Sequence, residues 1–170
     1  MKVLVKVIDG LSEWSGKFTS WIVLVLTGVM VLEVFMRYLF AKPTFFAYDL
    51  SWMLCGILAI MGGAYCHLHG GHVRVDFLID RLPPHRRAIF EAVLYCIFFF
   101  PLFYVLVWYV TDNVIFSWSI GERTSDSTWR PPLYPFKTML ALGLVLLLLQ
   151  GIAEFVKHLY IIIKGVPLEH

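Results

Sequence analysis

The segment AVLYCIFFFPLFYVLVWYVT, residues 92–111, carries no charged side chain. A helix needs about 20 predominantly apolar residues to cross the hydrocarbon core of a bilayer, so this segment is expected to span a membrane. Similar apolar runs predict four spans in all, at residues 18–40, 45–67, 88–110 and 138–160. Of the 170 residues, 59% are hydrophobic and 15% are charged, whereas soluble domains carry about 25% charged residues. The sequence therefore predicts an all-α integral membrane protein.

The four spans are expected to form one transmembrane bundle over residues 1–167. The last three residues, 168–170, resemble the start of an expression tag and are left out of the fold. Pro101 lies in the middle of the third span and is expected to kink it. Ala59 and Gly63 form a step of two small residues on the second span, which favours close helix approach.

The connection between the second and third spans has a helical pattern of its own. Apolar residues recur there at the spacing of one helix face, at Val75, Leu78, Ile79 and Leu82, and charged residues lie between them. This pattern is typical of a helix that lies in the membrane interface. We therefore expect a short interfacial helix, which ends before Pro83 because the residue before a proline disfavours helix.

The basic residues indicate the orientation of the chain. Lys and Arg are more frequent in the N-terminal tail, the central connection and the C-terminal end than in the other two connections. Positive residues favour the cytoplasmic side, so both termini are expected to be cytoplasmic.

Composition and motifs exclude several classes of function. The net charge is +2 without a long basic run, which argues against a nucleic-acid partner. Cys55, Cys66 and Cys96 lie in apolar runs without a CxxC motif, so they are interpreted as small hydrophobic residues. The chain has no Walker loop and no GxSxG motif. We therefore expect a protein that is not an enzyme and that holds no cofactor or metal.

Charged residues inside the apolar runs need partners, because a charge in the bilayer costs about 2.5 kcal/mol or more. Glu33 and Arg37 are four residues apart on the first span and can form an ion pair. Asp49 opens the second span at a similar depth. We expect these three residues to form a cluster that joins the first two helices. The alternative for Glu33 is a proton- or cation-binding carboxylate, as in small four-helix multidrug exporters that act alone.

Polar residues also gather toward the other end of the helices. Gln150, Glu154, Glu91 and His158 are interpreted as groups that hydrogen-bond between helices near the interface. Several histidines are candidate haem ligands, since helix bundles can hold haem between histidines on facing helices. They are His67, His69, His72, His85 and His158. A haem-binding membrane anchor of an oxidoreductase therefore stays open as a second function, whereas zinc lacks the usual ligand spacing.

A series of short motifs in order along the chain resembles a known family. They are Glu33-Val34-Phe35-Met36-Arg37-Tyr38, Asp49-Leu50-Ser51-Trp52, Gly62-Gly63-Ala64, His69-Gly70-Gly71-His72-Val73-Arg74-Val75-Asp76, Leu82-Pro83, Pro132-Leu133-Tyr134-Pro135-Phe136-Lys137 and Leu149-Gln150-Gly151. Together they resemble the small, DctQ-like membrane subunit of tripartite ATP-independent periplasmic (TRAP) transporters. The family usually has Glu at the position of Asp49.

The resemblance implies a non-catalytic subunit of a bacterial inner-membrane transporter that takes up organic acids with a sodium gradient. It implies two protein partners, a large multi-span membrane subunit that carries the substrate and sodium sites and a periplasmic binding protein, besides membrane lipids. The small subunit is then expected to be a static scaffold without a substrate or sodium site. Six residues are candidates for partner contact or for internal structure: Glu33, Arg37 and Asp49 near the outside, and His72, Arg74 and Asp76 near the inside.

Overall fold

The computed structural model describes residues 2–69, 83–125 and 127–164. The elements in chain order are α1 (Lys2–Leu39), α2 (Ala47–Leu68), α4 (Pro84–Leu94), the π-helix η1 (Tyr95–Phe99), α5 (Phe100–Ile120) and α6 (Tyr134–Lys164). Apart from one isolated bridge, these residues contain no β-structure. Four helical stretches in them are long and apolar enough to cross a membrane, which confirms the all-helical, four-span prediction. The expected interfacial helix, His72, Arg74, Asp76 and residues 168–170 lie outside the described residues.

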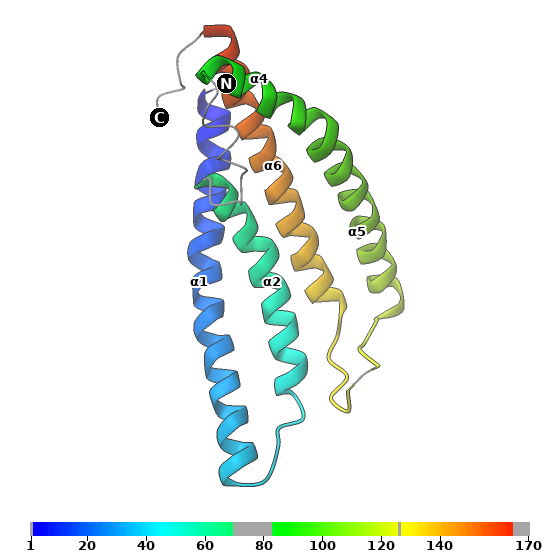
Figure 1. Ribbon diagram of the computed structural model, residues 1–170. Coiled ribbons are helices and arrows are strands. Elements are labelled where there is room, and N and C mark those ends of the chain that lie inside the picture. The colour runs from blue at the N-terminus through cyan, green and yellow to red at the C-terminus, as the bar shows by residue number, and fades with distance from the viewer. Residues whose placement is uncertain (1, 70–82, 126, 165–170) are drawn as a thin grey trace.

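The helices run lengthwise beside one another (Figure 1). We call the end where α1 begins and α6 finishes the terminal end, and the end with the α1–α2 and α5–α6 connections the loop end. Figure 1 shows that the α1–α2 connection extends farther at the loop end than the α5–α6 connection does. The α1–α2 pair is therefore displaced along the bundle relative to α5 and α6.

Helix α1 begins at Lys2, well before the span expected from residue 18. Its first turns hold Val5 and Ile8, which are buried against Ala153 of α6. They also hold Asp9 and Ser12, which hydrogen-bond to α6. The segment is amphipathic, so packing on α6 extends the helix beyond its purely apolar run.

Helix α6 is the centre of the bundle, because it contacts α1, α2, α4 and α5. Gly143 allows α2 to pack closely against α6. A Cβ atom there would lie 2.5 Å from Ile60 Cγ2 and 3.3 Å from the backbone nitrogen of Met61. Gly63 is in a similar position, with a Cβ atom meeting Leu147 Cδ1 at 2.9 Å, whereas Ala59 is exposed. Of the expected small-residue step, Gly63 is the member that faces α6.

The third span is one continuous but irregular helix made of α4, η1 and α5. The five π-helical residues of η1 end two residues before the proline at residue 101. Proline has no N–H for the carbonyl four residues back and its ring crowds that turn. A wider turn, in which Phe100 N–H bonds to Tyr95 O, accommodates it. Figure 1 shows this span bowing along its length, and its most apolar window has no residue buried inside the bundle.

The loop end is closed by local backbone contacts. Helix α5 ends at Ile120 and is followed by Gly121, whose φ of 58° is the left-handed conformation that glycine adopts readily. Glu122 N–H then bonds to Ser117 O at 3.0 Å, and Leu133 N–H bonds to Glu122 O at 2.9 Å. These bonds fix the entry into α6.

Candidate functional site

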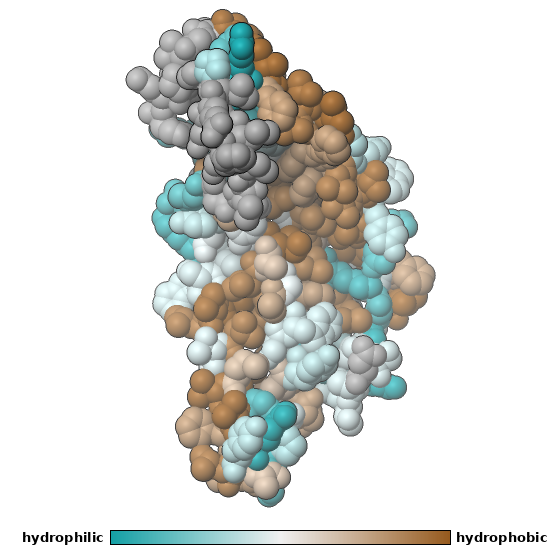
Figure 2. Space-filling view, in the orientation of Figure 1, coloured by the Kyte–Doolittle hydropathy of each residue, from teal (hydrophilic) through white to brown (hydrophobic). Residues whose placement is uncertain are grey.

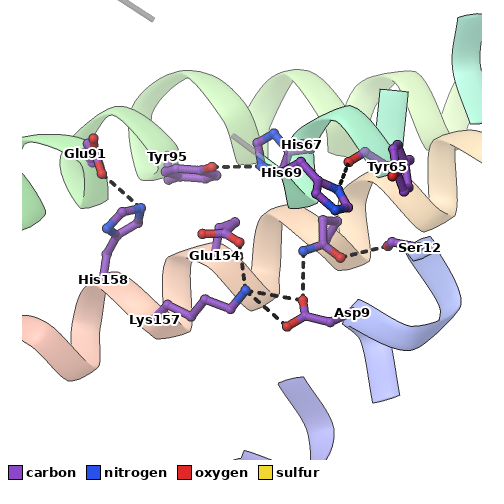
Figure 3. A network of polar contacts seen from close by, with 11 residues as sticks. Asp9, Ser12, Tyr65, His67, His69, Glu91, Tyr95, Glu154, Lys157 and His158 are labelled. Atoms are coloured by element: carbon purple, nitrogen blue, oxygen red, sulfur yellow. Dashed lines mark hydrogen bonds and ion pairs between the residues drawn. The ribbon is translucent and has the colours of Figure 1, made fainter. Parts of the chain in front are cut away.

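Polar side chains join α1 to α6 near the terminal end (Figure 3). Ser12 Oγ donates a hydrogen bond to Gln150 Oε1 at 2.7 Å, and Gln150 Nε2 donates to Asp9 Oδ1 at 2.9 Å. Ser12 and Gln150 are both fully buried. Their bonds hold the first and last helices at one relative height, because a slip along the axis would leave buried polar groups unpaired.

Lys157 extends this network with charges. Its ammonium lies 2.8 Å from Glu154 Oε1 and 3.2 Å from Asp9 Oδ2. All three side chains are largely shielded, since between 13% and 15% of each is exposed. Two carboxylates share one ammonium, so the cluster depends on Lys157 for its charge balance.

A second set of contacts ties the third span to α6 and α2. His158 Nε2 of α6 lies 3.0 Å from Glu91 Oε2 of α4, and Arg87 Nε donates to the other oxygen of Glu91 at 3.2 Å. The Tyr95 hydroxyl of η1 pairs with His67 Nε2 of α2 at 2.8 Å. Figure 3 shows both contacts along the same side of α6. Together they join three spans at the terminal end.

These contacts bear on the haem and zinc alternatives. The imidazoles of His67 and His158 are engaged by Tyr95 and Glu91, and the Tyr95 ring lies about 6 Å from both, with centroid distances of 6.0 and 5.9 Å. The His69 ring lies 3.1 Å from Tyr65 O. Among the described residues, no three His, Cys, Asp or Glu side chains are grouped to hold a metal. The haem-anchor alternative is not supported.

At the loop end, Glu33 and Arg37 form the expected ion pair. Arg37 Nη2 lies 2.5 Å from Glu33 Oε1, and Arg37 Nε lies 3.0 Å from the same oxygen. The other carboxylate oxygen accepts hydrogen bonds from the backbone N–H of Thr44, at 2.9 Å, and from the Thr44 hydroxyl. Glu33 thereby ties α1 to the connection before α2. The Arg37 side chain remains 59% exposed, so it can also reach a neighbouring molecule.

Asp49 does not join that cluster in the structure. It is fully buried in the first turn of α2, where the helix N-terminus favours a negative charge. Trp52 Nε1 donates to Asp49 Oδ1 at 3.4 Å, and Asp49 Oδ2 has no hydrogen-bond partner among the described residues. Asp49 and Arg37 stay apart because the first is buried while the second lies on the exposed side of α1.

A salt bridge clasps the α5–α6 connection. Lys137 Nζ lies 2.5 Å from Glu122 Oε2, and about a quarter of each side chain is exposed. The hydrogen bond from Lys137 holds the pKa of Glu122 below its ordinary value. This charge pair lies beside the backbone bonds that begin α6.

Sequence reasoning missed several members of these networks. Asp9 and Ser12 were not singled out, although Asp9, Ser12, Ser15 and Thr19 recur at helical spacing and the last three are buried. That stripe of small polar residues was the available signal. Tyr95 had no comparable signal, because a tyrosine in an apolar run is common in membrane helices. Gln150, Glu91 and His158 make contacts between helices, as expected, whereas Glu154 pairs with Lys157 on its own helix.

The chemistry of these groups is that of joints between helices. Buried donors meet buried acceptors, and most charged groups meet opposite charges on the same or a neighbouring helix. A buried polar network of this kind favours one packing arrangement over others.

The comparisons identify a family. A family model described as "Tripartite ATP-independent periplasmic transporters, DctQ component" matches residues 26–160, a stretch that includes the last part of α1, all of α2, α4, η1 and α5, and most of α6. A search of curated proteins found no match. Because the family model covers most of the chain, the protein belongs to the DctQ family, the small membrane component of TRAP transporters.

Proposed function

We propose that this DctQ subunit is the static scaffold of a sodium-driven TRAP transporter that takes up organic acids. In this proposal the large membrane subunit carries substrate and sodium, and a periplasmic binding protein delivers the substrate. The choice of organic acids and of sodium rests on the family resemblance. The chain itself binds neither substrate nor ion.

The observation that carries the scaffold role is the use of buried polar groups to lock helices together. Ser12, Gln150 and Lys157 join α1 to α6, while Glu91 with His158 joins α4 to α6. A moving carrier needs flexible or broken helices beside its substrate. Here the irregular turn of η1 is lined by aromatic and aliphatic side chains, as the groove formed by Leu94, Phe98 and Phe103 illustrates.

The exposed apolar surface supports partner and lipid contact. Large hydrophobic side chains cover the outside of α1 and α5, including Trp21, Phe35, Tyr104 and Trp108. In this proposal part of that surface faces the large subunit and the rest faces lipid. Arg37 is the member of the outer candidate set with the exposure needed to contact a partner.

We place the protein in the bacterial inner membrane with the terminal end in the cytoplasm and the loop end in the periplasm. The concentration of Lys and Arg in the N-terminal tail, central connection and C-terminal end supports this orientation. The periplasmic loop end would then face the binding protein. His72, Arg74 and Asp76 belong to the central connection and are proposed to contact the large subunit on the cytoplasmic side.

A reversible cross-link tests whether the bundle stays rigid during transport. Ile60 and Gly143 approach closely enough for a disulfide in an Ile60→Cys, Gly143→Cys variant without the native cysteines. The complete transporter should take up substrate at the same rate with this α2–α6 bond oxidised or reduced, because a static frame does not need these helices to separate. Loss of uptake on oxidation, with recovery on reduction, would contradict the scaffold role. The reduced state of the same variant is the matched control.

A further inference from the structure

Exposed apolar side chains run along most of the length of α1 and of the third span. On α1 they extend from Val7 to Phe40 and are most frequent from Leu24 onward, toward the loop end. On the third span they extend from Ile89 to Ile120, so that they begin close to the terminal end on α4 and η1. Figure 2 shows this as brown surface at the upper right, over α4 and α5, and at the lower left, over α1.

Charged side chains mark the ends of the uncharged stretches. On α1 these are the paired Glu13 and Lys17 toward the terminal end, 51% and 72% exposed, and the Glu33–Arg37 pair toward the loop end, where Arg37 is 59% exposed. On α5 the exposed Asp112 lies toward the loop end. Figure 2 shows hydrophilic surface at the left above the middle, at the lower right and near the bottom. The uncharged runs are therefore 18–32 on α1, 92–111 on the third span and 138–153 on α6.

Contacts to α6 give the relative height of these runs. Ser12 meets Gln150 on the α1 side, whereas Phe100 meets Phe155 on the α5 side. By these contacts, the centre of the uncharged run of α1 lies opposite about residue 137 of α6. The centre of the uncharged run of the third span lies opposite about residue 154 of α6. At 1.5 Å per residue, the two centres are staggered by about 25 Å along the bundle.

A bilayer core about 30 Å thick is a flat slab, and an upright bundle cannot place both runs inside it. If α6 were centred upright, the Val31–Leu39 stretch of α1 and the apolar side chains of α4 would stand in water at opposite ends. Burying apolar surface away from water is favourable. Helix α6 lies between α1 and α5, and the axes of packed helices are about 8–10 Å apart. The axes of α1 and α5 are therefore separated by roughly 20 Å across the bundle.

We propose that the bundle lies strongly tilted in the bilayer, with an oblique belt of exposed apolar side chains facing lipid hydrocarbon. Tilting brings the run of α1 and the run of the third span closer in depth. A stagger of about 25 Å over roughly 20 Å of width would need a tilt of about 50° to be removed completely, so the tilt is expected at or beyond the upper end of the roughly 0–40° range of membrane helices. The cluster of Asp9, Glu154 and Lys157 then lies at headgroup depth on the α1 side. The inference concerns the membrane-spanning architecture and does not depend on the transported substrate.

Two pairs of exposed residues distinguish a tilted bundle from an upright one. Leu11 and Leu102 lie at nearly the same height along the bundle axis, and so do Leu24 and Ile115, according to the contacts with α6. An upright bundle puts both members of a pair at equal depth. The tilt puts Leu102 and Leu24 in the hydrocarbon core, and Leu11 and Ile115 near the headgroups.

Spin labels at these four positions, one at a time, measure depth in the complete transporter reconstituted in lipid nanodiscs. The ratio of collision rates with oxygen and with a water-soluble nickel chelate reports depth, and it should place Leu102 and Leu24 deeper than their pair mates by about 10 Å. All four side chains are exposed, so labelling should spare the packing, and retained uptake verifies the fold. Equal depths within both pairs would overturn the tilt. That result would mean that the bundle stands upright and that protein, not lipid, covers the apolar residues outside the hydrocarbon core. The background lacks the native thiols Cys55, Cys66 and Cys96.

Discussion

Replacing Lys157 by Met tests the charge balance of the α1–α6 network. Methionine keeps most of the length of the apolar stem but removes the ammonium that lies 2.8 Å from Glu154 and 3.2 Å from Asp9. A hydrogen bond to a charged group contributes about 1.5–3 kcal/mol, and removing one partner of a buried ion pair costs about 3–5 kcal/mol. The two carboxylates are 13% exposed, so a loss of about 3 kcal/mol in the free energy of unfolding is expected.

The matched variant is Asp9→Asn. Its side-chain oxygen can still accept the hydrogen bond from Gln150, and the ion pair between Lys157 and Glu154 remains. A loss of about 1 kcal/mol is expected, as for one ordinary hydrogen bond. The double variant should lose less than the sum of the two single losses, because residues in one network are coupled.

The measurement is denaturant unfolding of the purified subunit in detergent, followed by tryptophan fluorescence near pH 7. The tryptophan residues, six in the chain, provide the signal. If Lys157→Met is no less stable than Asp9→Asn, the ammonium does not hold the two carboxylates together and the network reasoning fails. Additive losses in the double variant would show that Asp9 and Lys157 act independently.

Three further results are expected. Gly143→Ala should destabilise the bundle by about 1–2 kcal/mol, because the new methyl group overpacks against α2. Gly28→Ala is the control and should be neutral or slightly stabilising, because nothing lies within 4 Å of its new Cβ atom. Equal unfolding midpoints for the two variants would refute the close packing at Gly143. Tyr95→Phe should lose about 1 kcal/mol with its hydroxyl contact, and an unchanged midpoint would count against that joint. The pKa of Glu122 is lower in the folded chain than in the unfolded chain. The stabilisation that ionised Glu122 contributes is therefore fully present above the unfolded pKa of about 4.3, and it is lost as pH falls through the folded pKa. Stability should therefore decline more between about pH 5 and pH 3 in the natural chain than in a Lys137→Met variant, and parallel curves would contradict this.

The sequence was most informative where the solvent or the local helix geometry decides the outcome. Lipid requires long apolar helices, so the four spans could be predicted from apolar runs alone. The pairing of Glu33 with Arg37 follows from their spacing of four residues within one helix. The irregular turn before Pro101 follows from the missing N–H of proline. Each of these features depends on neighbours in sequence.

Contacts between distant segments were harder to predict. The bond between Ser12 and Gln150 joins residues 138 positions apart, and nothing near either residue specifies the other. Asp49 illustrates the same limit. Its depth along α2 made Arg37 the expected partner, but its actual environment depends on how α2 is rotated against its neighbours. Which face of a helix turns inward is set by the packing of the whole bundle.

The central position of α6 has a consequence for biosynthesis. A chain emerging from the ribosome delivers α1 and α2 first, and these two can pack on each other at once. The third span has its main contacts with α6, so it must wait in the membrane until the fourth span is inserted. Completion of α6 is therefore the event that assembles the subunit, and newly made chains interrupted before it would offer a quality-control protease an α1–α2 hairpin beside a separate third helix.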